Sequence, residues 1–403
     1  MSAKPRIVVF ADHLLYPSET FIQAQANALR EHEPVFAGSR RVAGLQLPQE
    51  RTYTLNPGSL SGKIRELKFK ILGSAPHMER QLAALRPALL HAHYGPNGLW
   101  ALPLARRLRV PLVVSFHGSD IAITDMRYQK ASLGFHYYFP NKSKIKKNGT
   151  AFLAVSKFVQ RKLLEQGFPP KKVLLQYTGI DTSKFKPAST EDRPMILFVG
   201  RLVDFKGPEF FIRAASDVQK QVPAADVVLV GDGPLRKELE SLAKQSLRRY
   251  RFLGVQTPEQ VRDWMNRASM VCMPSVTTRS GEAEGFGMVC AEAQAVGKPV
   301  VAFSSGGIPE IILHGVTGFL APERDWRALA GHLVTLLENV ELRERFGRSG
   351  REAMLRQFDL EHCTTQLEKV YRMVANADQP QEETPDGSIV WSGAAVSSSR
   401  GAA

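Results

Sequence analysis

Short apolar runs alternate with amphipathic segments along most of this chain. In the first half, aliphatic and β-branched runs of strand length predict buried parallel strands at residues 7–10, 89–93, 110–116, 152–155 and 173–175. Segments with helical spacing, such as residues 96–107 and 157–166, separate these runs. Because a helix that links two parallel strands forms a right-handed crossover, the pattern predicts a doubly wound α/β sheet.

A second series of the same kind follows, with strands predicted at residues 196–199, 227–230, 252–253, 270–273 and 299–303. The stretch between the two series is rich in Thr, Ser, Lys and Pro and lacks apolar periodicity, as is typical of a connection between domains. We therefore expect a Rossmann-like domain at residues 1–180, a linker at 181–195 and a second Rossmann-like domain at 196–357.

The apolar pattern changes in the last part of the chain. We expect a helix over residues 358–376 that packs back toward the N-terminal domain. Residues 377–403 are dominated by Pro, Glu, Gly, Ser and Ala, a composition that buries too little apolar surface to offset the loss of conformational entropy. We expect a disordered tail there.

Composition narrows the class of protein. A chain of 403 residues suits two domains, and no apolar run approaches the roughly 18 residues that a membrane span needs. The cysteines, Cys272, Cys290 and Cys363, form no C-x-x-C pair, which favours a reducing compartment such as the cytoplasm. A formal net charge of +14 favours polyanionic partners: phosphorylated substrates, nucleic acid or an anionic membrane surface.

One predicted helix of the first domain has two interpretations. Its apolar residues share one helical face, and cations lie beside them: Leu60, Ile64, Leu67 and Ile71, with Lys63, Arg65, Lys68 and Lys70. Such a helix can pack its apolar stripe on the sheet, or it can lie on anionic lipid. The sequence leaves both open.

Candidate chemistry in the second domain begins after the strand at residues 196–199. Glycines there allow a tight turn, and Arg201 and Lys206 follow at the carboxyl end of the sheet, where doubly wound folds bind ligands. Two cations at this place suit a diphosphate.

A pair of carboxylates, Glu284 and Glu292, lies eight residues apart across a glycine-rich helix start. We expect the backbone N–H groups of Phe286, Gly287 and Met288 to point at a bound anion. Glu284 is expected in the loop, where it can accept sugar hydroxyls. Glu292 is expected two turns into the helix, where it can accept the two ribose hydroxyls.

Histidines mark the first domain. The strand at residues 110–116 ends in His117-Gly118-Ser119-Asp120, and a histidine at the carboxyl end of a strand beside glycine favours a functional role for His117. We expect His91 and His93, on the preceding strand, to point to opposite faces and to be structural.

These motifs carry a family resemblance. Together with the segments G-K-P-V-V-A at 297–302 and G-G-I-P-E at 306–310, the cations and the glutamate pair resemble the donor-binding half of GT-B glycosyltransferases of family 4, over nearly the whole chain to about residue 372. The resemblance implies an α/β, GT-B fold: two Rossmann-like doubly wound domains that face each other across a cleft, the first for the acceptor and the second for the nucleotide-sugar donor. It places Arg201 and Lys206 on the diphosphate, Glu284 on the sugar and Glu292 on the ribose. It also places His117 beside the transferred sugar, with Asp120 as a second polar group.

The first strand-to-helix loop departs from the family pattern, because Pro17-Ser18-Glu19-Thr20-Phe21 stands where many relatives have a glycine pair. This stretch resembles a subgroup that acts in bacterial exopolysaccharide and colanic-acid-type assembly. Ser18, Glu19 and Thr20 are therefore candidates for the acceptor side, and Ser18 is also expected to be the N-cap of a helix.

The resemblance implies a retaining transferase that moves a hexose-type sugar from a UDP- or GDP-sugar to a glycan or a polyprenyl-diphosphate-linked oligosaccharide. We expect no cofactor and no divalent metal, because Arg201, Lys206 and the amides of residues 286–288 can stabilise the leaving phosphate and the loops lack a D-x-D pair. The expected catalytic residues are His117, Glu284, Arg201 and Lys206.

Two other functions remain open. One is a GT-B nucleotide-sugar 2-epimerase, and the other is a basic nucleic-acid-binding protein. The sequence contains no aromatic-interleaved basic motif of the known nucleic-acid-binding modules, so we expect no nucleic-acid partner. We expect a cytoplasmic protein in peripheral contact with the anionic inner face of the plasma membrane.

Overall fold

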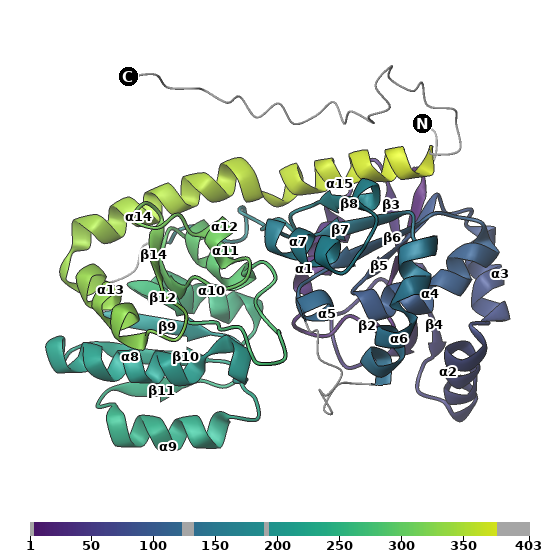
Figure 1. Cartoon of the computed structure of the whole chain (residues 1–403). Coiled ribbons are helices and arrows are strands. Elements are labelled where there is room, and N and C mark those ends of the chain that lie inside the picture. The colour runs from purple at the N-terminus through teal and green to yellow at the C-terminus, as the bar shows by residue number, and fades with distance from the viewer. Residues whose placement is uncertain (1–3, 123–132, 189–192, 377–403) are drawn as a thin grey trace, which may run out of the picture.

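The computed structural model describes residues 4–122, 133–188 and 193–376, which form two α/β domains (Figure 1). The expected tail at residues 377–403 lies outside the described residues. Within the described ranges, no helix has both the length and the apolarity needed to cross a bilayer.

The N-terminal domain is built on an eight-stranded sheet with the order β2-β3-β1-β5-β6-β7-β8, in which β4 also pairs with β3. All of its strands are parallel: β1 Arg6–Phe10, β2 His13–Leu14, β3 Glu33–Arg41, β4 Thr52–Asn56, β5 Leu89–His93, β6 Leu112–Phe116, β7 Ala151–Ala154 and β8 Val173–Leu175. The sequence analysis missed β2, β3 and β4. These strands lie toward one edge of the sheet and mix polar residues, a proline and glycine with the apolar ones, so they lack a continuous apolar run.

Helices connect these strands: α1 Thr20–Asn27, α2 Leu60–Leu72, α3 Pro76–Ala84, α4 Gly95–Leu108, α5 Ser119–Ala122, α6 Leu133–Asn148 and α7 Lys157–Glu165. The short helices η1 Gln49–Arg51 and η2 Pro170–Lys172 precede β4 and β8. The helices predicted at 96–107 and 157–166 correspond to α4 and α7 within one residue at each end.

The C-terminal domain is built on a six-stranded parallel sheet with the order β11-β10-β9-β12-β13-β14. Its strands are β9 Met195–Val199, β10 Asp226–Val230, β11 Tyr250–Phe252, β12 Met270–Met273, β13 Val300–Phe303 and β14 Gly318–Ala321. Its helices are η3 Asp204–Lys206, α8 Pro208–Gln221, α9 Arg236–Ser246, α10 Pro258–Arg267, α11 Met288–Ala295, α12 Ile308–Ile311, α13 Trp326–Glu338, α14 Val340–Ala353 and the π-helix η4 Met354–Phe358.

The strand order explains where a ligand can bind. From β9 the chain first adds strands on one side of the sheet and then on the other, so that β9 and β12 are neighbours whose following loops diverge. Ligands of doubly wound sheets bind at this switch point, outside the carboxyl ends of the strands. The central strand β9, Met-Ile-Leu-Phe-Val, is buried along its whole length because helices cover both faces of the sheet. The predicted two-domain α/β architecture is confirmed.

The chain crosses between the domains twice, and the two crossings lie side by side. The Ile180 N–H donates to the Phe358 carbonyl over 2.7 Å, and the Leu360 N–H donates to the Ile180 carbonyl over 2.9 Å. The Arg351 guanidinium donates to the carbonyls of Thr182, Phe185 and Ala295. The linker is thus hydrogen-bonded to both the second crossing and the C-terminal domain.

The final helix, α15 Leu360–Ala375, lies along the N-terminal domain (Figure 1). Its residues Leu367, Tyr371 and Val374 pack in one cluster with residues of β1, β5, β6 and β7. The buried Glu368 accepts hydrogen bonds from the N–H groups of Glu31 and His32, at 2.7 and 3.1 Å, and contacts the His32 ring at 3.0 Å. In the described part of the chain, these three residues are the single group of His, Cys, Asp or Glu side chains close enough to share a metal ion. Their hydrogen bonds anchor α15.

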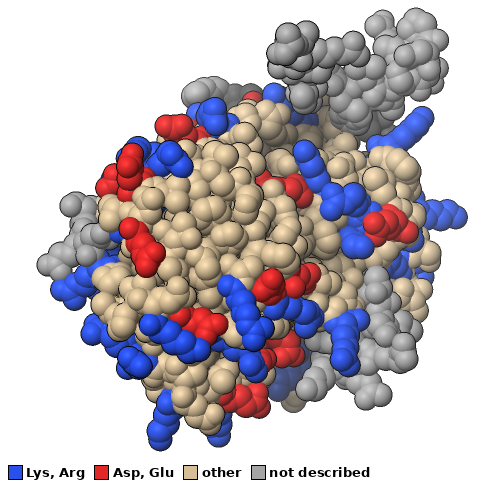
Figure 2. All heavy atoms as spheres, turned by 60° about the vertical axis from the view of Figure 1, so that its left-hand side comes forward, with Lys and Arg blue, Asp and Glu red and all other residues tan. Residues whose placement is uncertain are grey.

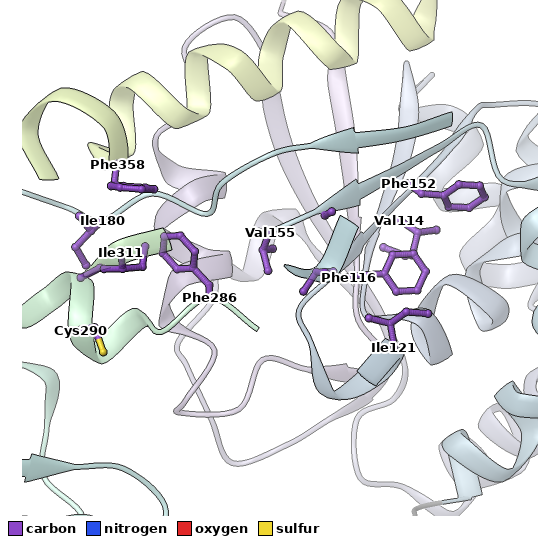
Figure 3. Packing of buried hydrophobic residues seen from close by; sticks show 14 of the residues in the cluster. Val114, Phe116, Ile121, Phe152, Val155, Ile180, Phe286, Cys290, Ile311 and Phe358 are labelled. Carbon is purple, nitrogen blue, oxygen red and sulfur yellow. The ribbon is translucent and has the colours of Figure 1, made fainter. Parts of the chain in front are cut away.

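One apolar core runs through both domains. Figure 3 shows Val155, which follows β7, between the aromatic residues of the N-terminal sheet and Phe286 and Ile311 of the C-terminal domain. The Phe286 ring lies 5.7 Å from that of Phe358 and 5.9 Å from that of Tyr177. Apolar packing therefore holds the domains together beside the crossings.

A polar contact reinforces this junction. Glu310, on α12 of the C-terminal domain, accepts the first backbone N–H groups of α7 in the other domain, those of Lys157 at 2.8 Å and Phe158 at 2.9 Å, and the Tyr177 hydroxyl at 3.1 Å. N–H groups in the first turn of a helix lack partners within that helix. Glu310 therefore caps a helix across the domain boundary.

Removing this cap gives a first prediction. In Glu310→Ala, the Lys157 and Phe158 amides lose their acceptor, and we expect about fivefold faster hydrogen exchange there, since one net hydrogen bond contributes about 1 kcal/mol. Exchange mass spectrometry of peptides that contain the start of α7 measures this. The exposed Glu338→Ala is the control, and equal exchange in both variants would contradict the assignment.

Candidate active site

Two residues meet at the switch point of the C-terminal sheet. Lys206 ends the turn η3 after β9, and Glu284 lies in the loop after β12. The Lys206 Nζ is 2.5 Å from the Glu284 Oε2, and both side chains are largely buried. The Ser275 hydroxyl also donates to this carboxylate oxygen over 3.4 Å. A cation and a carboxylate are thus held together where the fold binds ligands.

Arg201 lies beside this pair and is exposed. Its guanidinium carbon is 5.6 Å from the centre of the Phe205 ring, and the Lys206 Nζ is 5.0 Å from the same ring. Burial raises the pKa of Glu282, and the charges of Arg201 and Lys206 oppose that shift. The sequence analysis did not select Glu282, although it stands two residues before Glu284.

The helix after this loop, α11, begins at Met288 without a side-chain cap, and Gly287 has a φ of 96°. Its first N–H groups therefore face the loop, as a helix start that binds an anion requires. Phe286 is buried in the apolar core, so its side chain does not line the site. Glu292 lies four residues after Met288, just over one turn into the helix, so the expectation of two turns is wrong. Burial raises the Glu292 pKa to about 7, opposed by Lys184 and Lys206.

His117 follows β6 in the N-terminal domain, in a turn that Asp120 holds together. The buried Asp120 carboxylate accepts the N–H groups of His117 at 3.0 Å, Gly118 at 2.9 Å and Gly95 at 2.9 Å. Burial raises the Asp120 pKa to about 6 even though these hydrogen bonds lower it. Both carboxylate oxygens of Asp120 therefore face the protein's own backbone.

A line of rings leads from His117 into the domain. The His117 Nε2 is 3.1 Å from the His93 Nδ1, and the ring centres of His93 and His91 are 4.4 Å apart. The His91 ring bonds to the Tyr371 hydroxyl at 2.7 Å and the Ser115 hydroxyl at 2.8 Å. The expectation that His91 and His93 face opposite sides is wrong, because residues two apart on a strand share a face.

These histidines are neutral at neutral pH. Burial lowers the pKa of His93 to about 3. Burial also lowers the pKa values of His91 and His117 well below their usual range, and the neighbouring histidine rings add to the shift of these two. A neutral imidazole both donates and accepts hydrogen bonds.

The first loop of the N-terminal domain also differs in detail from the expectation. Helix α1 has its N-cap at Glu19, so the prediction that Ser18 is the N-cap is wrong; Ser18 and Thr20 make no cap hydrogen bond. The Glu19 carboxylate instead accepts the Tyr16 N–H over 2.8 Å and the Tyr94 hydroxyl. This carboxylate is therefore occupied by the loop and by Tyr94, and burial raises its pKa.

The sequence analysis missed Tyr94, which follows β5 at the switch point of the N-terminal sheet. Its ring and that of Phe21 lie 4.6 and 5.0 Å from the His117 ring. Burial, and then the charges of Glu19 and Asp120, raise the pKa of the Tyr94 phenol, while Arg201 of the other domain opposes the shift. The position of Tyr94 at a strand end, before Gly95-Pro96, is the sequence signal that could have identified it, and in the structure its φ of 72° marks the turn that begins there.

The turn that carries His117 and the loop that carries Glu284 touch through their backbones. A Cβ atom on Gly285 would overlap the His117 carbonyl oxygen, and one on Gly118 would lie 2.6 Å from the Gly285 Cα. The buried Ser156 hydroxyl donates to the Gly285 carbonyl over 2.6 Å. The structure therefore brings His117 next to the loop that carries Glu284.

This contact gives a second prediction. Gly285→Ala introduces a methyl group where the His117 carbonyl lies, so we expect the free energy of unfolding to fall by about 1–3 kcal/mol, as in other overpacked sites. Denaturant unfolding measures this. The matched control is Gly331→Ala, because no heavy atom lies within 4 Å of the added Cβ, and a Gly285→Ala chain as stable as this control would show that the junction is not tightly packed.

Known proteins resemble this chain over both domains. Residues 179–353 match the family model described as Glycosyl transferases group 1, and residues 18–184 match the one described as Glycosyltransferase Family 4. An uncharacterised glycosyltransferase of Methanocaldococcus jannaschii is 30% identical over 290 residues, which cover 72% of this chain and 76% of the relative. The putative colanic acid biosynthesis glycosyltransferase WcaL of Salmonella typhimurium is 28% identical over 292 residues, 70% of each chain.

A solved structure shares the fold. The crystal structure of Anabaena HepE in complex with UDP and glucose matches with a TM-score of 0.72 and 19% identity, over 92% of this chain and 100% of that chain. Because both family models match and relatives share the sequence over both domains, the chain belongs to the GT-B glycosyltransferases of family 4.

Proposed function

We propose that this glycosyltransferase is a retaining enzyme that moves a hexose-type sugar from a UDP- or GDP-sugar to a glycan or a polyprenyl-diphosphate-linked oligosaccharide, in the synthesis of bacterial exopolysaccharide or another cell-surface polysaccharide. The observation that carries the proposal is the Lys206–Glu284 pair at the switch point of the donor domain, with the His117 turn packed against the adjacent Gly285.

The positive groups of the C-terminal domain suit the diphosphate of the donor. Arg201 and Lys206 lie side by side against Phe205, and α11 begins without a side-chain cap at the same loop. Cleavage of the sugar–phosphate bond leaves negative charge on the departing phosphate, which these cations and the N–H groups of Phe286, Gly287 and Met288 would stabilise. In the proposed reaction these groups take the place of a divalent metal.

The remaining site residues take the sugar and the nucleoside. Glu284 accepts sugar hydroxyls, Glu292 accepts the ribose hydroxyls, and the neutral His117 ring forms a hydrogen bond to the transferred sugar. Ser18, Glu19, Thr20 and Asp120 remain candidates for the acceptor side, with Glu19 and Asp120 acting through the Tyr94 and His117 contacts described above.

We favour attack by the acceptor hydroxyl on the same face of the sugar that the phosphate leaves. The bond between the anomeric carbon and the phosphate oxygen breaks, the acceptor oxygen bonds to that carbon, and the acceptor proton passes to the departing phosphate oxygen. Anomeric configuration is then kept. The alternative is a covalent sugar–Glu284 intermediate; we assign Glu284 to the sugar hydroxyls instead, with its Oε2 oriented by Lys206 and Ser275.

The acceptor class is inferred from the relatives. The Salmonella typhimurium relative is named as a putative colanic acid biosynthesis glycosyltransferase, and the loop at residues 17–21 resembles the same subgroup. In this proposal the lipid-linked acceptor lies at the cytoplasmic face of the membrane, and the protein is in peripheral contact with anionic lipid there.

A donor screen tests the function. The full chain is incubated with UDP- and GDP-hexoses and a bacterial membrane lipid extract, and products are identified by mass and by anomeric configuration. We expect transfer with retention, loss of donor binding in Glu292→Ala, and a fall in kcat of about tenfold or more in His117→Ala with donor binding kept. The control is Glu338→Ala.

Four outcomes would reject the proposal. Transfer with inversion rejects the mechanism, and a sugar adduct trapped on Glu284 does so as well. Epimerised sugar and free nucleotide without any acceptor would assign the chain to the 2-epimerases. Salt-sensitive DNA binding that competes with the donor would assign it to the nucleic-acid-binding proteins.

The pKa of Glu292 gives a pH prediction. With a pKa of about 7, this carboxylate loses its charge as the pH falls through 7, and a protonated carboxyl accepts fewer ribose hydroxyls. We expect the donor KM to rise up to about tenfold between pH 8 and pH 6, as the ionised fraction falls from about nine tenths to one tenth. Donor titrations over this range measure it. Glu292→Gln should give a high KM with a flat profile, and an unchanged profile in that variant would assign the titration to another group.

A further inference from the structure

Helix α2 turns its apolar stripe to solvent. Its exposed fractions are 76% for Leu60, 52% for Ile64, 59% for Leu67, 70% for Ile71 and 68% for Leu72. At about 100° of rotation per residue, the first four lie on one side of the helix. Of the two interpretations of this segment, the one in which the stripe packs on the sheet is therefore wrong.

The opposite face of α2 fixes this orientation. Phe69 is fully buried, with its ring 6.3 Å from that of Phe10. The buried Glu66 carboxylate accepts the Asn56 amide at 2.7 Å and the Arg40 guanidinium at 3.0 Å. Burial alone would raise the Glu66 pKa, but hydrogen bonds from these groups and from Lys70 lower it to about 2. Rotating the helix to bury its stripe would expose Phe69 and break these bonds.

The ends of α2 are equally well defined. The Ser59 hydroxyl accepts the Gly62 N–H over 3.1 Å, and Gly73 closes the helix with a φ of 61°. Both are standard caps. The exposed stripe therefore belongs to a regular, capped helix.

The charges beside the apolar stripe indicate what kind of partner this surface binds. Lys63, Arg65 and Lys68 are exposed, and the single carboxylate of the helix, Glu66, points into the domain. On the face of the C-terminal domain shown in Figure 2, by contrast, cations are interspersed with carboxylates. An apolar stripe bordered by cations alone matches a bilayer of anionic lipid, which offers acyl chains beneath a layer of negative charge.

We propose that α2 is the membrane-docking surface of this enzyme: it lies flat on an anionic bilayer with Leu60, Ile64, Leu67 and Ile71 inserted and Lys63, Arg65 and Lys68 among the headgroups. The helix lies at the outer end of the N-terminal domain, away from the C-terminal domain (Figure 1). Docking through α2 therefore leaves the donor domain free.

The same helix contacts the loop assigned to the acceptor side. The Lys70 Nζ is 3.0 Å from the carboxylate of Asp12, in the loop that follows β1. That loop continues through His13, whose ring is bonded to the Tyr16 hydroxyl at 2.6 Å, to Glu19. Docking thus holds the acceptor loop near the lipid surface. This step rests on the proposed lipid-linked acceptor, whereas docking itself does not.

Vesicle flotation tests the docking. The full chain is mixed with phosphatidylcholine vesicles with or without 30% phosphatidylglycerol, and about tenfold more protein should float with the anionic vesicles. In Ile64→Gln/Leu67→Gln we expect about tenfold weaker partitioning, as in Lys63→Glu/Lys68→Glu. The matched control is Leu164→Gln/Leu355→Gln, which removes two exposed leucines elsewhere and should bind like the unaltered chain. Thermal unfolding shows whether each variant keeps its fold.

Several results would overturn the proposal: no flotation of the unaltered chain, equal flotation of the Ile64→Gln/Leu67→Gln variant, or a dimer in solution that this variant dissociates, which would assign the stripe to a second copy. Donor binding measured in the same variants separates the two proposals. Intact donor binding with lost flotation supports docking, while a chain that floats but transfers no sugar keeps the docking surface and rejects the proposed function.

Discussion

The arrangement of this enzyme depends on a backbone contact between two glycines of different domains. Because neither Gly118 nor Gly285 has a Cβ atom, the turn after β6 can rest on the loop after β12. That contact puts His117 next to the loop of Glu284, and the Ser156 and Glu310 hydrogen bonds form beside it. A side chain at either glycine would push apart the turn that carries His117 and the loop that carries Glu284, which the proposed reaction brings together.

Much of the fold could be predicted because its strands are buried on both faces. Such strands are continuous apolar runs, as in Met195–Val199 and Val300–Phe303, and continuous runs are visible in a sequence. The strands at Glu33–Arg41 and Thr52–Asn56 were missed because they lie toward the edge of the sheet, where polar residues are tolerated. The return of residues 358–376 to the N-terminal domain was expected, but the pairing of the two crossings could not be foreseen, because backbone hydrogen bonds such as that of Ile180 leave no mark in side-chain type.

The candidate site likewise contains residues that could be predicted from the sequence and residues that were missed. Residues that follow a strand in a recognisable motif, such as Lys206 and Glu284, could be selected in advance. Tyr94 and His93 were not selected, because their place beside His117 depends on how neighbouring strands align, and His93 was misjudged through a wrong side assignment. In α2, periodicity revealed an apolar stripe but not its direction, which depends on the buried bonds of Glu66 to Asn56 and Arg40.

The hydrogen bond between His93 and His117 limits what His117 can do. It occupies the His117 Nε2, so the Nδ1 is the ring nitrogen that remains for a ligand. Between two neutral imidazoles one ring donates and the other accepts, so the Nδ1 either carries a proton or offers a lone pair according to which ring donates. Burial disfavours the doubly protonated ring in both cases. His117 is then a neutral hydrogen-bonding group, and in the proposed reaction the charge that stabilises the leaving phosphate comes from Arg201, Lys206 and the start of α11 in the other domain.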